Sequence, residues 1–253
     1  MQFSDFQAFV NNVLPGVESI ARRYYDLTGE GQGVEYKADN SPVTRADREI
    51  EAYLFDQISA RFPDHSILGE EGANRSGSED YTWLLDPIDG TKSFIHHIPL
   101  FTTLIGVMHS GRAIYGAIYN PILGDLTVGD RVSAFHNGKP CRVRDCARLE
   151  DATLLSSDLF GFRKYRDGDR FEKLVLACRV ERSWGDGTGY QMVATGRADI
   201  MADAKVNLWD IAAVIPVILG AGGVLRTMDG AEPEEADSLV ATCPSLMPQI
   251  DLF

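Results

Sequence analysis

Two acidic residues stand at the end of an apolar run, in the segment Trp83-Leu84-Leu85-Asp86-Pro87-Ile88-Asp89-Gly90-Thr91. The run predicts a strand that ends at Asp86, because Pro87 lacks the N–H that another ladder hydrogen bond needs. Gly90 permits a close approach of the backbone to a small group. Thr91 can begin a helix whose first N–H groups face the acids, which suits a phosphate. A loop with two solvated acids and a helix cap is an equally good interpretation of this segment alone.

Other acids follow other predicted elements. Glu70-Glu71 closes a strand after Ile67-Leu68-Gly69, and Asp210 begins an apolar helix. Each has an ordinary explanation, as a surface acid at a strand end or as a helix-start acid stabilised by the dipole. Acids that converge on an apolar neighbourhood lose hydration and repel one another, so they need cations. Mg²⁺ fits best, because it prefers oxygen ligands and is normally shared between carboxylates and substrate phosphates. Zinc or iron would call for a set of histidines or cysteines, which is missing.

Four motifs in this order resemble those of the inositol monophosphatase family of magnesium-dependent phosphatases. The motifs are Ser41-Pro42-Val43-Thr44-Arg45-Ala46-Asp47, Gly69-Glu70-Glu71, Asp86-Pro87-Ile88-Asp89-Gly90-Thr91, and Trp209-Asp210 followed by Gly220-Ala221-Gly222-Gly223. The resemblance implies an α+β fold, a layered αβαβα sandwich, formed by one domain over residues 1–253 and usually assembled as a homodimer. The half over about 1–138 would carry most metal ligands, and the half over about 139–253 the substrate pocket and Asp210.

Carried over position by position, the resemblance implies a site for two or three Mg²⁺ ions. The first ion would be bound by Glu70, Asp86 and the backbone carbonyl of Ile88. The second would be bound by Asp86, Asp89 and Asp210. The family commonly uses a third, weaker ion near Glu70.

The resemblance also assigns the attacking water and the phosphate. Asp47 and Thr91 would hold and activate the water, so they count with Glu70 as catalytic residues. The backbone amides of Gly90 and Thr91 would receive the phosphate. Thr44-Arg45-Ala46-Asp47 also has the pattern of a helix capping box, and the two roles of Asp47 coexist only if its carboxylate still faces the metals.

The spacing of the acids separates two phosphatase chemistries. Haloacid-dehalogenase-type enzymes use an Asp-x-Asp pair whose first member becomes phosphorylated. Asp86 and Asp89 are instead three positions apart, with a proline directly after the first. We therefore predict that water attacks phosphorus directly and inverts it, without a phosphoenzyme.

The resemblance implies that the helix before the Asp210 motif, and the segment just before it, line the pocket for the organic part of the substrate. Trp184-Gly185-Asp186, the stretch 193–199 and Asn207-Leu208-Trp209-Asp210 look like the histidinol-phosphate phosphatase branch of the family. Asp186, Asp203 and Arg182 are the candidate pocket residues. Histidinol carries an ammonium and an imidazole, and a charged hydrogen bond to an acid contributes about 1.5–3 kcal/mol. A helix cap, a surface turn and a solvated arginine are the ordinary readings of these three residues.

The alternatives within the enzyme class are inositol 1-phosphate, then fructose 1,6-bisphosphate and adenosine 3′,5′-bisphosphate. A bisphosphate would need extra basic residues in the pocket, and the sequence makes none evident. The alternative from another class is a non-catalytic protein that holds Ca²⁺ or Mg²⁺ structurally.

Length, charge and cysteine content bound these possibilities. The 253-residue chain has a formal net charge of −13, which disfavours nucleic acid or an anionic membrane as a partner. No stretch approaches the ~20 apolar residues of a membrane span. Met1 to Val10 carries no basic residue, so it is not a secretory signal, and the 4 cysteines are too sparse for a disulfide scaffold. These features predict a soluble, cytoplasmic protein that acts on a small phosphate ester.

Apolar spacing predicts the elements that position these residues. Helices are expected over 3–20, with a bend at Pro15, and over 45–62, 187–196 and 209–219; strands are expected over 66–68, 82–85, 104–108 and 113–119, the last two joined by a hairpin loop at 109–112. Asn137-Gly138-Lys139-Pro140 is the candidate boundary between the halves. The segment 29–42, with Lys37 and Asp39, is the hypothetical lid over the third ion.

Overall fold

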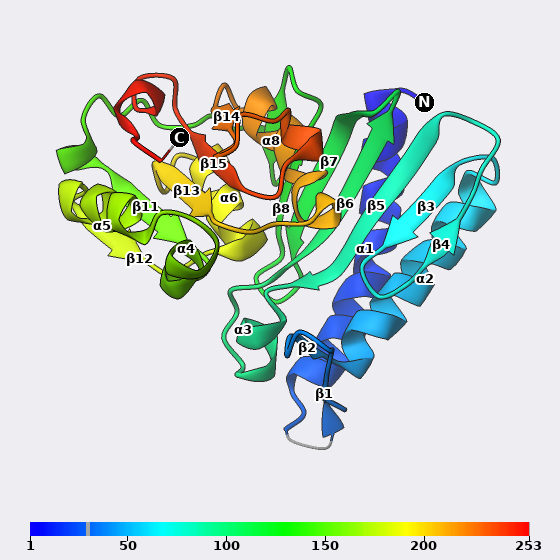
Figure 1. Cartoon of the computed structure of the whole chain (residues 1–253). Helices are drawn as coiled ribbons and strands as arrows, with labels where there is room; N and C mark the ends of the chain where they lie inside the picture. Colours follow the sequence, from blue (N-terminus) through cyan, green and yellow to red (C-terminus); the bar gives the residue numbers. More distant parts are fainter. Residues whose placement is uncertain (29–30, 253) are drawn as a thin grey trace.

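The computed structural model describes residues 1–28 and 31–252, so Gly29 and Glu30 of the hypothetical lid lie outside the described residues. Five layers follow one another across the molecule (Figure 1). They are α1 (Phe3–Tyr25) with α2 (Arg45–Arg61), the larger sheet, α6 (Asp186–Ala194) with α8 (Val214–Gly220), the smaller sheet, and α4 (Leu159–Tyr165) with α5 (Gly168–Ala177). The predicted αβαβα sandwich is therefore confirmed.

The larger sheet has eight strands in the order β10-β9-β8-β7-β6-β5-β3-β4, and the smaller has five in the order β12-β11-β13-β15-β14. The strands of the larger sheet are β3 (Ser66–Gly69), β4 (Asn74–Arg75), β5 (Tyr81–Asp89), β6 (Thr102–His109), β7 (Arg112–Asn120), β8 (Asp125–Gly129), β9 (Ala134–His136) and β10 (Lys139–Pro140). Those of the smaller are β11 (Thr153–Ser156), β12 (Val180–Arg182), β13 (Ile200–Asp203), β14 (Val224–Arg226) and β15 (Leu239–Thr242).

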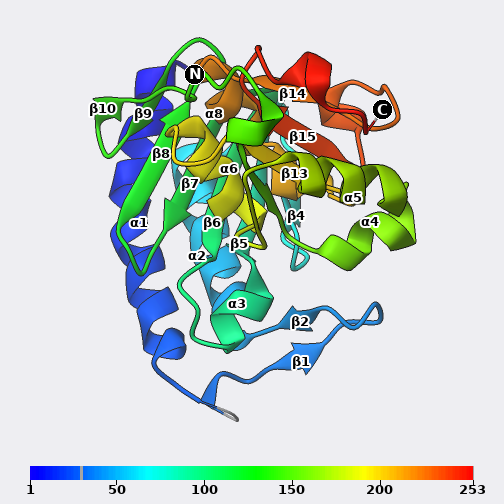
Figure 2. The same cartoon turned by 90° about the vertical axis from the view of Figure 1, so that its left-hand side faces the viewer.

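The remaining elements are short. The strands β1 (Glu35–Tyr36) and β2 (Pro42–Val43) form a separate hairpin. It projects from the molecule on the side of α3 (Thr91–Ile95), as Figure 2 shows. The helix α7 (Leu208–Ile211) precedes α8. Short 3-10 turns within 31–252 include η2 (Leu149–Asp151), η3 (Pro233–Glu235) and η4 (Met247–Gln249).

Alternating side chains of the larger sheet fill two cores. Trp83 and Leu85 on β5, with Val107 on β6, pack against α1 and α2. Leu104 and Ile118 point to the opposite face and pack with α6 and α8. Because the period of a strand is two, consecutive residues serve different layers. Each such side chain contributes about 1.5–3 kcal/mol through burial, so both faces of the sheet hold the layers together.

The first two helices predicted from the apolar spacing are confirmed, and the first is longer than predicted. α1 continues through Pro15 to Tyr25, and the buried side chains of Phe6, Val10 and Val17 share its inner face. α2 begins after Thr44 and ends at Arg61, as predicted.

The single helix predicted over 209–219 is wrong. Two helices, α7 and α8, stand there, separated at Ala212 and Ala213. Pro216 explains the break, because it has no N–H to donate to the carbonyl of Ala212 four residues earlier.

Three glycines in adjacent strands make room for this pair of helices. Gly106 pairs with Gly116, and Gly116 pairs with Gly129. A Cβ on Gly106 would lie 2.8 Å from the carbonyl carbon of Ala212, and one on Gly116 would lie 2.7 Å from that of Ala213. These distances are far below ordinary van der Waals contact, so the row of glycines fixes how deeply α7 and α8 sit on the sheet.

Two turns bear on the sequence predictions. The loop between β6 and β7 is the predicted hairpin, and Ser110 and Gly111 both have positive φ there. Asn137 and Gly138, expected at the boundary between the halves, form a tight turn between β9 and β10 of the larger sheet. The chain passes to the smaller sheet only after Pro140. No helix among the described residues is long and apolar enough to span a membrane.

Candidate active site

The carboxyl ends of two parallel strands bring the first acids together. β3 runs parallel to β5, with Gly69 opposite Leu85. The N–H of Glu70 donates to the carbonyl of Leu85 at 3.0 Å, which continues the ladder by one residue. Glu70 therefore lies beside Asp86, although 16 positions separate them in the sequence.

A β-bulge brings Asp86 and Asp89 to one site. Residues three apart on a regular strand point to opposite faces. Here Asp86 lies opposite Leu104 while Asp89 lies opposite Thr102, so the register shifts between the two acids. Such a shift re-aims side chains. The bulge begins at Pro87, whose missing N–H already excludes a regular ladder, and whose carbonyl accepts a hydrogen bond from the hydroxyl of Thr103 at 2.8 Å.

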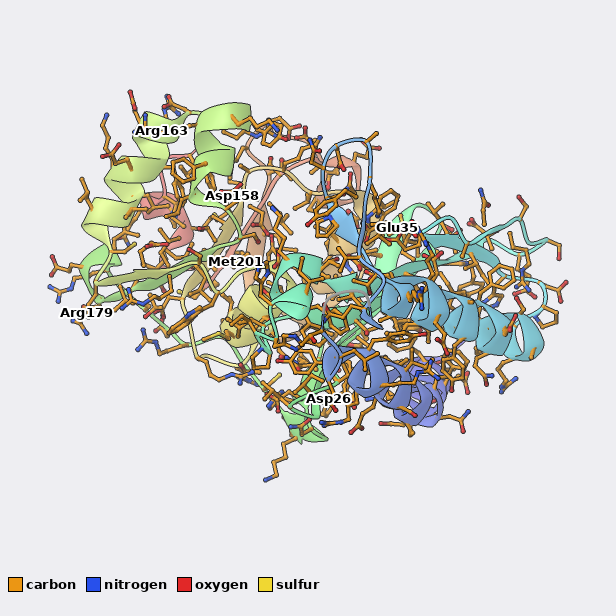
Figure 3. All side chains as sticks on the ribbon, turned by 90° about the horizontal axis from the view of Figure 1, so that it is seen from below. Asp26, Glu35, Asp158, Arg163, Arg179 and Met201 are labelled. Atoms are coloured by element: carbon orange, nitrogen blue, oxygen red, sulfur yellow. The ribbon has the colours of Figure 1, made fainter. Side chains whose placement is uncertain are left out.

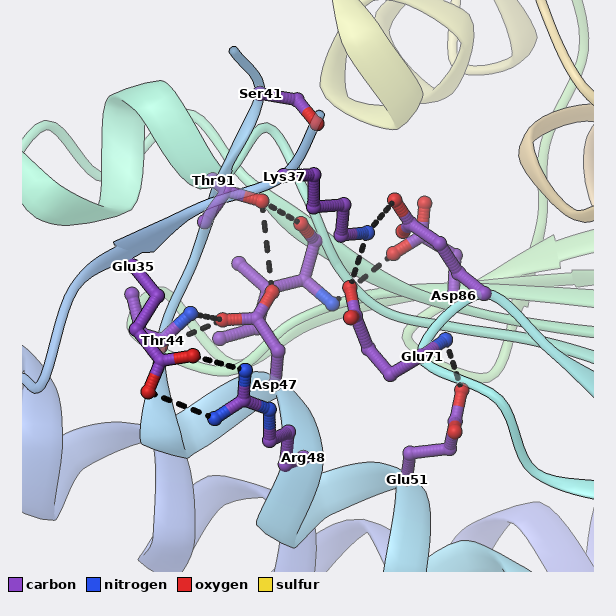
Figure 4. A network of polar contacts seen from close by, with 12 residues as sticks. Glu35, Lys37, Ser41, Thr44, Asp47, Arg48, Glu51, Glu71, Asp86 and Thr91 are labelled. Atoms are coloured by element: carbon purple, nitrogen blue, oxygen red, sulfur yellow. Dashed lines mark hydrogen bonds and ion pairs between the residues drawn. The ribbon is translucent and has the colours of Figure 1, made fainter. Parts of the chain in front are cut away.

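The start of α2 holds Asp47. The predicted capping box is present: the hydroxyl of Thr44 accepts from the N–H of Ala46 at 3.1 Å, and the N–H of Thr44 donates to Asp47 Oδ2 at 2.8 Å. The other carboxylate oxygen, Oδ1, lies 3.4 Å from the hydroxyl of Thr91. That hydroxyl also lies 3.0 Å from the carbonyl oxygen of Ile88. Capping thus leaves one oxygen of Asp47 facing the acid cluster (Figure 4).

The central helices bring in the remaining acid and a contact that the sequence did not indicate. Asp210, on α7, accepts a hydrogen bond from the N–H of Asn207 at 2.7 Å. The N–H of Gly187, at the start of α6, donates to Asp89. A Cβ on Gly187 would lie 2.8 Å from Asp89 Oδ2, so this approach requires glycine.

Burial and mutual repulsion raise the pKa values of these carboxyl groups. Burial, with the charges of Glu70 and Asp89, raises the pKa of Asp86 well above its ordinary value. Burial and neighbouring carboxylates act in the same way on the pKa of Asp89. Burial raises the pKa of Asp47 to about 7, against hydrogen bonds from Thr44 that lower it, and burial likewise raises that of Asp210 to about 7. Groups that raise one another's pKa in this way lie close together and keep their charge only beside a cation.

An ammonium group stands among these acids. Lys37 Nζ lies 2.8 Å from Glu70 Oε1 and 2.7 Å from Glu71 Oε1. Burial lowers the pKa of Lys37, but the hydrogen bonds to the two glutamates raise it above its ordinary value. In this conformation, no three His, Cys, Asp or Glu side chains within residues 1–28 and 31–252 converge closely enough to hold one ion. Carboxylate oxygens are the type of ligand that Mg²⁺ prefers. In this structure the ammonium group of Lys37 already pairs with two of the carboxylates, those of Glu70 and Glu71.

A cavity of about 300 Å³ includes Asp203 in its lining, but Glu70, Asp86, Asp89 and Asp210 are not among the residues that line it. It is lined from four places in the chain: the β1–β2 turn, α3, the start and end of α4, and the residues after β13. Ser157 and Asp203 line it, and the N–H of Ser157 donates to Asp203 at 3.2 Å. Figure 3, seen from below, shows Asp158 at the start of α4. Three basic residues also line the cavity, contrary to the expectation that none would: Lys92, Lys164 and Lys205.

The candidate pocket residues differ in position. Asp203 is buried, and burial together with the charge of Asp186 raises its pKa to about 7. Asp186 starts α6 with a positive φ, and its N–H donates to the hydroxyl of Ser157 at 2.7 Å. A Cβ on Gly90 would lie 3.0 Å from Asp186 Oδ2, so this carboxylate lies close to Gly90. Arg182 is exposed, and its guanidinium donates to the carbonyl of Glu181 at 2.6 Å instead of lining the cavity.

Comparison with known proteins agrees with this arrangement. The model of the inositol monophosphatase family matches residues 5–250. The chain belongs to the inositol monophosphatase family. Among curated relatives, it is 38% identical over 188 residues to the histidinol-phosphatase of Chlorobaculum parvum, which covers 74% of this chain and 73% of the relative. It is 33% identical over 191 residues to the fructose-1,6-bisphosphatase/inositol-1-monophosphatase of Thermotoga maritima, covering 75% of this chain and 73% of the relative.

A solved structure extends the comparison to the fold. The IMPase of Thermotoga maritima superposes with a TM-score of 0.86 at 27% identity, and the match covers 97% of this chain and 95% of the other. Members of the inositol monophosphatase family are metal-dependent phosphatases, and this chain is accordingly a phosphoric monoester hydrolase.

Sequence reasoning missed several groups that touch the family motifs. Glu51 is buried and accepts backbone hydrogen bonds beside Glu70. The hydroxyl of Ser157 and the N–H of Gly187 hold Asp186 and Asp89. The only local sequence feature that pointed to these contacts was Gly187, because a glycine permits a close approach of the backbone.

Proposed function

We propose that this phosphatase depends on Mg²⁺ and hydrolyses L-histidinol phosphate by direct attack of water. The observation that carries the proposal is the burial of Asp86, Asp89 and Asp210, which raises the pKa of all three carboxyl groups; the charge of Asp210 adds to the shift at Asp86 and at Asp89. Glu70, Asp86 and the carbonyl of Ile88 would hold one ion. Asp86, Asp89 and Asp210 would hold another, and a third would lie near Glu70.

The bound ions would supply two things, a charge that reverses the repulsion of a phosphate dianion and a lowered pKa for the attacking water. The chain's own groups would do the rest. Asp47 Oδ1 and the hydroxyl of Thr91 lie 3.4 Å apart, and the attacking water would lie to one side of this pair and hydrogen-bond to both. Its proton would pass toward Asp47, whose raised pKa suits a group that accepts a proton near neutral pH.

The phosphate would bind where α3 begins. Gly90 precedes that helix with a φ of +95°. As at the start of any helix, the first N–H groups have no partner within the helix. The amides of Gly90 and Thr91 would receive the phosphate oxygens. Because water attacks directly, no phosphorylated Asp86 should form, and trapping such a species during turnover would refute this step.

The cavity supports the choice of histidinol phosphate. Asp203 lines the cavity, and Asp186, which does not line it, lies near enough to raise the pKa of Asp203. A substrate with an ammonium and an imidazole would use these two acids, and the relative from Chlorobaculum parvum is named a histidinol-phosphatase. Arg182 remains a candidate pocket residue with weaker support, since it does not line the cavity.

A second candidate substrate class is favoured by Lys92, Lys164 and Lys205. These lysines line the same cavity and would suit a second phosphate, as in fructose 1,6-bisphosphate. Lys205 already pairs with Asp237 at 3.0 Å, which leaves less positive charge for a ligand. Inositol 1-phosphate, which is neutral apart from its phosphate, is the third candidate.

Phosphate release from a substrate panel tests the proposal. The panel contains histidinol phosphate, inositol 1-phosphate, fructose 1,6-bisphosphate and adenosine 3′,5′-bisphosphate, each with and without Mg²⁺. We expect histidinol phosphate to be hydrolysed fastest and only with the metal. Comparable rates on all four would leave a broad phosphatase. Asp89→Asn should abolish turnover of every substrate while the protein stays folded; the matched control is Glu49→Gln, on the far side of α2, which should stay active.

Assembly and compartment belong to the same proposal. We expect a homodimer, which light scattering on the purified protein measures directly. We also expect the cytoplasm, where the four cysteines would remain the free thiols that the structure contains. Fractionation of the source cells tests this.

A further inference from the structure

The helix α2 carries a second buried acid one turn after Asp47. Glu51 is 4% exposed, and positions four apart lie on the same face of a helix. Its two carboxylate oxygens accept from the backbone N–H of Glu71 at 2.8 Å and from that of Ala73 at 2.7 Å. Figure 4 shows this carboxylate below the Glu71 segment. The metal-site assignment gives Glu51 no role.

These hydrogen bonds hold the turn that carries Glu70. The turn leaves β3 at Gly69 and closes with the N–H of Gly69 donating to the carbonyl of Ala73 at 2.8 Å. Within it, the N–H groups of Glu71 and Ala73 point inward to Glu51. A turn of this kind has few contacts of its own, so the buried carboxylate sets its orientation relative to α2.

Gly69 is shaped for this contact. A Cβ at Gly69 would overlap Glu51 Oε2 and would lie 2.5 Å from Glu51 Cδ. Only glycine lets the carboxylate reach under the turn. The second residue of the Gly69-Glu70-Glu71 motif is therefore placed by the first residue and by Glu51, an acid 19 positions earlier in the chain.

We infer that Glu51 is a positioning residue for the metal site, which acts by fixing the Glu70–Ala73 turn relative to Asp47 on the same helix. The inference rests on the proposed function, because it takes Glu70 as a metal ligand. The carboxylate is required because two N–H donors need two acceptors. A glutamine in its place offers one acceptor and one amide, and the amide donates where a donor already points.

Metal binding by the metal-free protein tests this without relying on turnover. Mn²⁺ binding is measured by titration calorimetry on the full chain, alongside thermal unfolding. Glu51→Gln should weaken Mn²⁺ binding about 10- to 100-fold, the usual cost of losing a group that orients a ligand. Gly69→Ala should weaken it similarly, since it displaces the same carboxylate without changing any charge. Glu49→Gln is the matched control: its half-buried carboxylate pairs with Arg23 and Tyr24 on α1 and not with the Glu70–Ala73 turn, so this variant should bind Mn²⁺ as the wild type does.

A kinetic comparison separates positioning from a general loss of structure. With saturating Mn²⁺, Glu51→Gln should recover most of its kcat, with the KM for the phosphate ester unchanged, because only the metal dependence shifts. Wild-type Mn²⁺ affinity in Glu51→Gln, with a lowered unfolding temperature, would overturn the inference and leave a purely structural role. Failure of the wild-type chain itself to bind the ion would refute the proposed function as well, so the two failures are distinguishable.

Discussion

The row of glycines beneath α7 and α8 (Gly106, Gly116 and Gly129) predicts that Gly116→Ala destabilises the protein. In the wild type, a Cβ on Gly116 would overlap the carbonyl oxygen of Ala213 and lie 2.7 Å from its carbonyl carbon. Ordinary contact begins near 3.4 Å, so the helix pair must move away from the sheet by a sizeable fraction of an ångström. Both partners are backbone, which cannot rotate out of the way as a flexible side chain can. Overpacking of this kind costs about 2–3 kcal/mol.

The assay for Gly116→Ala is thermal unfolding together with divalent-cation titration. For a chain of this size the destabilisation corresponds to a fall in Tm of about 4–12 °C. Since α7 carries Asp210, metal affinity should also fall, by about tenfold or more. Gly161→Ala, within α4, is the matched control: the added Cβ would lie 3.6 Å from Asp158 Cβ, which is ordinary contact, so the variant should keep the wild-type Tm or exceed it slightly. A wild-type Tm for Gly116→Ala would refute the argument that this row sets the depth of the helices.

The remaining predictions concern a buried histidine and the internal ammonium. His65 is buried, and its Nδ1 accepts from Trp83 Nε1 at 3.0 Å, while burial lowers the pKa of His65 below its ordinary value. The unfolded chain therefore binds this proton more readily, so the contribution of His65 to stability should be full above about pH 6.5 and should fall as the pH drops below it. Urea unfolding of the wild type and of His65→Phe at several pH values measures this contribution as the difference between their slopes, because the buried carboxyl groups titrate in both proteins. Lys37→Gln removes the cation between Glu70 and Glu71, so divalent-cation binding measured by calorimetry should tighten at least about tenfold, or about 1.4 kcal/mol. Unchanged affinity would show that Lys37 does not compete for these carboxylates.

The sequence by itself determined the family, the main elements and the identity of the acids. Apolar spacing located α1, α2 and the strands β3, β5, β6 and β7, because the period of burial follows directly from helix and strand geometry. Thr44 and Asp47 mark the start of α2 through a capping box, which needs only neighbours three positions apart. Such local patterns are readable because the interacting groups lie close together in the chain.

The tertiary structure alone decided how these residues meet. The parallel pairing of β3 with β5 places Glu70 beside Asp86, and a bulge turns Asp86 and Asp89 toward one site. Gly187 reaches Asp89 across 98 positions, and Glu51 reaches the Glu71 amide across 20. The lysines of the cavity come from three separate segments, so no local pattern could reveal them. Contacts between distant segments depend on register, bulges and helix depth, which packing sets and residue spacing does not encode.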